Sequence, residues 1–362
     1  MKRTAIVMAL VLVLSLLTGC AGTAVVYSGD CACPTEAEKP VYENATQETA
    51  PEYVPEGGLK TGLSIVTNLS KSVSATAEED GKASYDVTFV AVLVDDNGII
   101  ADCIIDSMGT TVAFDVHGSI VSDIDAAVAT KNELGDAYNM KLYGGAKYEW
   151  YEQADALAQY AVGKTVAELR EGAVNESGKA ADADLASKAT IHLGGYVGAI
   201  EAAVANAQFL GAQAGDELRL AVLAKLSSST PPTDEKNGNA QLDCDVTALT
   251  MNGDVITSCY IDSLQAKVAF DMVGAITSDI SSGIATKNGL GEGYNMKLYG
   301  GAKYEWYEQA ASFAAYVTGK TAADVAGIAI DAGTKPTDAD LSSSVTIAIG
   351  GFQALIQKAC AK

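Results

Sequence analysis

The residues with the most chemical capacity lie in a polar, aromatic segment that occurs twice. The first copy spans residues 130–154 and the second residues 286–310, an offset of 156 residues, and 22 of 25 positions are identical. We call these stretches the duplicated segments. Packing positions drift between apolar types of similar volume. Identity at Tyr, Asn, Lys, Gly and Glu positions therefore indicates a shared binding site or a constrained backbone path.

The side chains of the first copy suit a planar ligand. Four of them could stack on a flat ring or a sugar, namely Tyr138, Met140, Tyr143 and Tyr148. Gly144-Gly145 would allow close backbone approach, and Lys141 and Lys147 could meet a phosphate. In the alternative interpretation, the aromatic rings pack the loop against a helix that begins near Trp150, and the lysines lie in solvent.

Acid–base or metal chemistry has little support. His117 and His192 become Val273 and Ala348 in the second copy. No nucleophile elbow, phosphate loop or zinc-protease motif is present, and Cys31-Ala-Cys33 lacks the second pair of a zinc site. Four carboxylates are duplicated, and we expect Asp106 and Asp115 in turns and Glu149 and Glu152 on a solvated helix face. These observations favour an electron carrier or a binding protein over a catalyst with its own substrate.

The N-terminal residues predict an anchored, exported protein. Residues 1–20 combine a basic start, an apolar run and Leu17-Thr18-Gly19-Cys20, which resembles a bacterial lipoprotein signal peptide. The resemblance implies a lipid on Cys20 and attachment to the extracytoplasmic face of the cell membrane; the alternative is an ordinary signal peptide with a chance Cys. Residues 21–59 predict a disordered tether. A net charge of −22 argues against nucleic-acid partners.

Hydrophobic periodicity predicts an α+β fold of two tandem repeats, residues 60–210 and 211–362, each an antiparallel sheet with segregated helices. Alternation over Ser84–Val94 indicates a half-buried strand, and strands are also expected at 99–105 and 111–114. Ile120, Ile124 and Val128 have the spacing of a short amphipathic helix, as do Ile276, Ile280 and Ile284. Cys103 and Cys259, at equivalent positions, are interpreted as buried free thiols.

The second half of each repeat is expected to be mainly helical. Residues 132–145 are predicted as a loop. A helix follows with Trp150, Ala154, Leu157 and Ala158 on one face. Residues 182–190 are predicted as a polar turn, and 197–207 as a closing helix.

The order of these features resembles a known flavin-binding family. Residues 130–135, the Trp150 helix, Gly163-Lys164 and Asp184-Leu185-Ala186-Ser187-Lys188-Ala189-Thr190 occur in that order. This order is similar to the FMN-binding domain of the sodium-pumping NADH:quinone reductase C subunit, of the Rnf complex G subunit and of related extracellular flavin lipoproteins. Where that family's acceptor motif has Gly, this chain has Lys188 and, in the second copy, Ser344.

The resemblance implies FMN in each repeat, held through a phosphoester to Thr190 and to Thr346 or bound non-covalently. The implied FMN-contacting residues are Ser187, Leu134, Gly135, Tyr138 and Met140 with Thr190, and Ser343, Leu290, Gly291, Tyr294 and Met296 with Thr346. The first hypothesis is thus a lipid-anchored electron carrier with a redox partner. The second is a flavin-free binding or structural lipoprotein that holds a ligand or partner with the duplicated Tyr/Gly segments.

Overall fold

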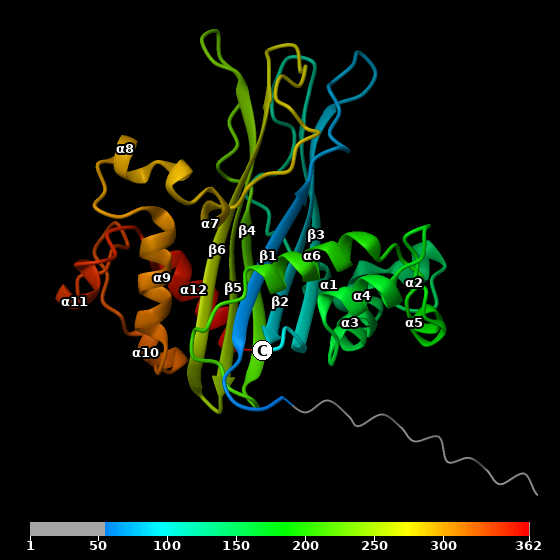
Figure 1. Cartoon of the computed structure of the whole chain (residues 1–362). Coiled ribbons are helices and arrows are strands. Elements are labelled where there is room, and N and C mark those ends of the chain that lie inside the picture. Colours follow the sequence, from blue (N-terminus) through cyan, green and yellow to red (C-terminus); the bar gives the residue numbers. More distant parts are fainter. Residues whose placement is uncertain (1–54, 362) are drawn as a thin grey trace, which may run out of the picture. The chain divides into compact units, whose positions relative to one another are not determined.

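The computed structural model describes residues 55–361 and shows an α+β protein with two three-stranded antiparallel sheets (Figure 1). The predicted signal peptide, Cys20 and residues 21–54 of the predicted tether lie outside the described residues. Both repeats belong to one compact unit, Pro51–Lys362. The strand order is β1-β2-β3 in the first sheet and β4-β5-β6 in the second. The strands are β1 (Lys60–Asn68), β2 (Gly81–Val94), β3 (Ile100–Phe114), β4 (Glu217–Lys225), β5 (Gly238–Asn252) and β6 (Val255–Phe270).

Strand β2 shows how one sheet serves two cores. Tyr85, Val87 and Phe89 point to one face and join an apolar cluster shared with the second sheet. Val90 and Val92 point to the opposite face and are buried against helices. The expected half-buried strand is therefore present, but its second half is buried on both faces.

Two strands differ from expectation. The predicted strands at 99–105 and 111–114 form one continuous strand, β3. Strand β1 has no clear apolar alternation, because Gly62 and Ser64 occupy buried positions. The α6 helix (Gly194–Ala205) packs closely there: a Cβ on Gly62 would lie 2.2 Å from the Ala203 carbonyl oxygen, and Ser64 Oγ donates to the Ala199 carbonyl at 2.7 Å.

The two sheets pack face to face around one apolar core that draws on both repeats. Where β3 and β6 end, the rings of Phe114 and Phe270 stack with centroids 4.1 Å apart and planes 6° from parallel. These residues are equivalents at the 156-residue offset. A pseudo-two-fold axis therefore passes between the rings, and each repeat completes the other's core.

Helices cover the outer face of each sheet, those of repeat one on one side and those of repeat two on the other (Figure 1). The helix predicted from Trp150 is α3, and all four side chains of its predicted apolar face are buried. The helices of these two layers are α3 (Trp150–Ala161), α4 (Val166–Ala173), α5 (Ala183–Lys188) and α6 in repeat one, and α9 (Trp306–Val317), α10 (Ala322–Ala326), α11 (Ala339–Ser342) and α12 (Gly350–Cys360) in repeat two.

The prediction of an amphipathic helix around Ile120, Ile124 and Val128 is wrong. This stretch is irregular, as is its counterpart in repeat two. Its three apolar side chains still pack against the shared core. Ser and Asp side chains compete for backbone groups here: the Asp123 carboxylate accepts from the Asp125 N–H, and Ser122 Oγ accepts from the Ala113 N–H.

We predict that Phe270→Ala lowers the free energy of unfolding by about 3–5 kcal/mol, because it removes one ring of the Phe114–Phe270 stack and leaves a cavity. Urea denaturation followed by circular dichroism measures the change. Since the repeats share this core, the variant should still unfold in one transition. Tyr143→Ala, at a side chain that is 84% exposed, is the control and should change stability by less than about 0.5 kcal/mol. Two separate transitions would contradict a shared core.

Candidate functional site

Each duplicated segment folds into three short helical turns that lead into a longer helix. Residues 132–145, predicted as a loop, are therefore mostly helical. In repeat one, Thr130 caps the first turn, with its hydroxyl accepting from the Glu133 N–H and the Glu133 carboxylate accepting from the Thr130 N–H. The turns are α1 (Lys131–Leu134), η1 (Gly135–Tyr138) and α2 (Met140–Gly144), repeated as α7 (Lys287–Leu290), η2 (Gly291–Tyr294) and α8 (Met296–Gly300).

Left-handed backbone positions join these turns. Asn139, between η1 and α2, has φ 59°, and Gly145, which ends α2, has φ 62°. Gly and Asn are the residues that adopt this conformation at least cost. The same φ values recur within 1° at Asn295 and Gly301. Their identity in the two copies thus has a backbone cause.

Glu149 is not on a solvated face, contrary to expectation. Its side chain is buried, and its carboxylate oxygens accept from the backbone N–H groups of Met140 at 2.7 Å and Lys141 at 3.1 Å. Glu305 makes the equivalent bonds with the same distances. Glu152 is the partly exposed carboxylate of the helix, and it forms an ion pair with Lys141 at 3.1 Å.

Gln153 connects the duplicated segment to the predicted FMN acceptor. Its buried amide Nε2 donates to the Tyr148 carbonyl at 2.9 Å and contacts Met140 Sδ at 3.5 Å. Its Oε1 accepts from the backbone N–H and the hydroxyl of Thr190, at 2.7 and 3.2 Å, and from the Ile191 N–H. Gln309 makes the same five contacts in repeat two.

The ammonium group of Lys131 lies near one aromatic ring of η1 and one of α3. Its Nζ lies 5.2 Å from the Tyr138 ring centroid and 4.9 Å from the Trp150 ring, distances at which a cation is attracted to an aromatic face. Burial lowers the pKa of Lys131. Lys287 lies at nearly the same distances from Tyr294 and Trp306.

The prediction that Asp106 lies in a turn is also wrong. The residue lies within β3, and its side chain is buried. Its carboxylate accepts from the Asn132 N–H at 3.1 Å, and Asn132 Nδ2 donates to the Ile105 carbonyl. Asp262 repeats this contact, and burial raises its pKa. Asp115 is a turn residue as expected, accepting from the N–H groups of His117 and Ser119.

In the structure, the residues of the implied flavin site lie in two places, around Gln153 and around η1. Thr190 is exposed and meets Met140 through Gln153. Leu134, Gly135 and Tyr138 lie at the start and end of η1, beside Lys131. Ser187 is exposed on α5 and donates to the Asp184 carbonyl at 2.7 Å. The repeat-two residues Thr346, Ser343, Leu290, Gly291, Tyr294 and Met296 lie at the equivalent places.

A shallow groove of about 360 Å³ runs between α3 and α5, close to Thr190. Tyr148 and Tyr151 line it together with the carboxylates of Glu152 and Asp155 and with Lys188, which precedes Thr190 by two residues. Thr190 itself lies four residues before the N-terminus of α6, and Lys179 Nζ donates to its carbonyl at 2.6 Å. Thr190 therefore lies between a bonded lysine and the start of a twelve-residue helix, while its exposed side chain bonds Gln153 through the hydroxyl.

A second surface feature is apolar. Leu142 and Tyr143 on α2 are 69% and 84% exposed, and Leu298 and Tyr299 on α8 have the same values. Large apolar side chains exposed this fully and in the same way twice are unusual for a surface with no partner.

Sequence reasoning missed the role of Gln153. A signal was present, because Gln153 and Gln309 fall on the otherwise apolar face of their helices and within the identical positions. A polar residue on a buried face has to find partners.

In comparisons with protein-family models, with curated proteins and with solved structures, no match to this chain is found. Within residues 55–361, no helix has the length and apolar character needed to cross a membrane. The described residues also contain no cluster of His, Cys, Asp and Glu side chains suited to a metal ion.

We predict that Gln153→Leu speeds amide hydrogen exchange at residues 139–148 and 189–191 at least tenfold, since it removes the bonds that join the two stretches. The free energy of unfolding should fall by roughly 1–3 kcal/mol, because buried polar groups lose their partners. Exchange mass spectrometry measures the first effect. The intact repeat-two segment is the internal control, and Gln159→Leu, at an exposed position on the same helix, is the matched variant. Unchanged exchange in the repeat-one segment would refute the bridging role of Gln153.

Proposed function

We propose that the protein is a lipid-anchored flavin carrier of the extracytoplasmic membrane face, with one FMN held at the surface of each repeat. The observation that carries this proposal is the pair of exposed threonines, Thr190 and Thr346, each bonded through a buried glutamine to its duplicated segment. The anchor is the predicted acylated Cys20. An FMN-binding-domain-like fold for each repeat is part of the same proposal.

The surroundings of Thr190 fit a phosphate group. The hydroxyl is accessible, Lys179 supplies a positive charge, and the N-terminus of α6 adds a favourable field. In repeat two, Thr346 has the same relation to the N-terminus of α12, and the residue equivalent to Lys179 is the exposed Lys335. The acceptor position is thus compatible with a phosphoester or with a non-covalently held phosphate.

The groove between α3 and α5 supports the ring end of the ligand. Tyr148 and Tyr151 provide aromatic surface there, on which a planar ring system can stack. Gln153 fixes the distance between this groove and Thr190 by bonding to both stretches. Bound flavin supplies one- and two-electron transfer, and the role of the chain is to position it and tune its surroundings.

The test is to produce the full chain in cells that contain a flavin transferase, then record a visible absorption spectrum and an intact mass. We expect two FMN per chain, one after Thr190→Ala or Thr346→Ala, and none after both. Thr76→Ala, at an exposed turn, is the control and should keep both. If attachment is non-covalent, the unmodified chain should still quench the fluorescence of added FMN. A colourless chain that leaves FMN fluorescence unchanged would refute the proposal.

A second candidate function rests on the exposed Leu-Tyr pairs of α2 and α8. A pseudo-two-fold axis relates the repeats, so the same surface is presented twice with that symmetry. Such an arrangement suits a two-fold symmetric partner protein, whose two copies of one site could engage both pairs with increased avidity. Tyrosine is also enriched among the residues that dominate protein interfaces.

A photo-crosslinking amino acid placed at Tyr143 or Tyr299 tests this candidate in cells. We expect both positions to capture the same protein, since the two surfaces are alike. Leu142→Ser combined with Leu298→Ser should reduce capture more than either change alone. Capture of unrelated proteins at the two positions, or of none, would refute it.

A further inference from the structure

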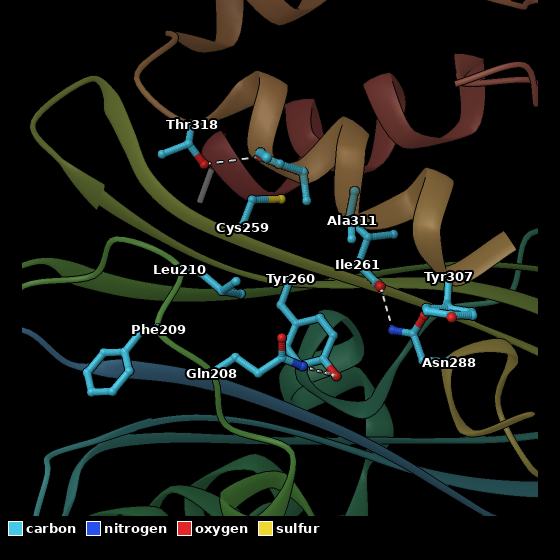
Figure 2. Close-up of a pocket in the computed structure, with 12 residues that line it drawn as sticks. Gln208, Phe209, Leu210, Cys259, Tyr260, Ile261, Asn288, Tyr307, Ala311 and Thr318 are labelled. Atoms are coloured by element: carbon cyan, nitrogen blue, oxygen red, sulfur yellow. Dashed lines mark hydrogen bonds between the residues drawn. The ribbon is translucent and has the colours of Figure 1, made fainter. Parts of the chain in front are cut away.

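A pocket of about 440 Å³ lies at the junction of the two repeats and shares Tyr307, the equivalent of Tyr151, with the proposed flavin groove of repeat two (Figure 2). Its walls are β6, α9 and the connection from α6 to β4. Figure 2 shows Ile261 of β6 beside Ala311 and Tyr307 of α9, whereas Tyr260 points to the other side of the strand, toward Gln208 of the connection. A volume of this size is typical of small-molecule sites.

The pocket exists because α9 presents small residues where it crosses β6. Ala311, Ala314 and Ala315 line the space, and an alanine side chain leaves room between a helix and a strand. The connection is held in place by β1: Thr61 N–H donates to the Gln208 carbonyl at 2.9 Å, and Gln208 N–H donates back at 3.0 Å. Backbone hydrogen bonds to β1 therefore hold the wall that the connection supplies.

Repeat one has an equivalent groove that differs in two respects. It is lined by the equivalent residues Cys103, Ile105, Asn132 and Tyr151, but its volume is about 250 Å³ and no residue of the α6–β4 connection borders it. It also holds the carboxylate of Asp155 where repeat two has Ala311. Among the described residues, an uncharged pocket of this size is thus found beside α9 of repeat two and not in the equivalent groove of repeat one.

The lining is uncharged. No Asp, Glu, Lys, Arg or His contributes to it, and burial raises the pKa of the Cys259 thiol to about 12, so the sulfur is neutral. Several polar groups are already bonded within the protein: Asn288 Nδ2 donates to the Ile261 carbonyl at 2.9 Å, and Thr318 Oγ1 donates to the Ala314 carbonyl at 3.1 Å. The Gln208 amide reaches the Tyr260 hydroxyl only at a long 3.4 Å, so this pair can turn to a ligand.

We infer that this pocket binds an uncharged, mainly apolar small molecule, with a ring or chain against the α9 alanines and one polar group at Tyr260 and Gln208. A charged ligand would lose its hydration without gaining a partner. The inference does not depend on flavin at Thr190 or Thr346.

The test uses N-phenyl-1-naphthylamine, an uncharged aromatic dye whose fluorescence rises in an apolar site, titrated into the full chain. We expect saturable binding of one dye per chain. Ala311→Asp places the repeat-one residue into the pocket and should weaken binding at least tenfold, and Ala315→Gln, which copies Gln159, should do the same. Circular dichroism melting confirms that each variant is folded, and the second variant serves if the first is not.

Thr76→Ala, at an exposed turn that does not line the pocket, is the control and should leave the titration unchanged. Absence of saturable binding to the unmodified chain would overturn the inference. Equal affinity in both pocket variants, or two equivalents of dye per chain, would also overturn it, since the dye would then bind elsewhere.

Discussion

The structure depends on apolar contact between two sheets that cannot be buried separately. Each three-stranded sheet has one face against its own helices and one face against the other sheet, with Phe114 stacked on Phe270 between them. A lone repeat would expose the whole inner face to water, at a cost of about 25 cal/mol for each Å² of apolar surface. The duplication therefore has a physical role, because the sheet of the second copy buries the inner apolar face of the first copy's sheet. It also creates surfaces that a single repeat lacks, including the pocket beside α9.

Hydrogen-bond satisfaction explains the parts of the duplicated segments that are least changed. The turns α1, η1 and α2 have little buried apolar surface, so their path is held by buried polar side chains, chiefly Glu149 and Gln153. A buried carboxylate that lost its N–H partners would pay its full desolvation cost, and a residue other than Gly or Asn at the left-handed positions would be strained. These constraints apply to Glu, Gln, Asn and Gly. They do not apply to Leu142 and Tyr143, whose exposed side chains satisfy no internal need, and their retention in both copies therefore favours a contact with something outside the chain.

Sequence patterns predict the structure correctly where a single periodicity corresponds to a single buried face, and incorrectly elsewhere. The α+β class, strand β2 and the apolar face of α3 follow from simple alternation or helical spacing. The helix expected around Ile124 failed because apolar spacing cannot register that neighbouring Ser and Asp side chains bond the backbone. Strand β1 has no clear apolar alternation, because Gly62 and Ser64 occupy the buried positions where α6 packs against it. The sequence predicts Asp106 in a turn and Glu149 on a solvated helix face, because charged residues are mostly exposed. Only the fold reveals the backbone N–H groups that make their burial tolerable.

The differences between the repeats are as informative as their identity. Where a polar side chain supports the backbone, the two copies agree and their distances nearly coincide, as for Gln153 and Gln309. Beside α9 the constraint is only to fill or line a space, and there repeat two has Ala311 and Ala315 where repeat one has Asp155 and Gln159. Both differences leave fewer polar atoms in the wall of repeat two, next to a connection that borders only one of the two equivalent places in the described chain. Differences under packing alone would tend to conserve volume. The two alanines instead leave room for an uncharged pocket, which argues that this side of repeat two has a role that repeat one does not share.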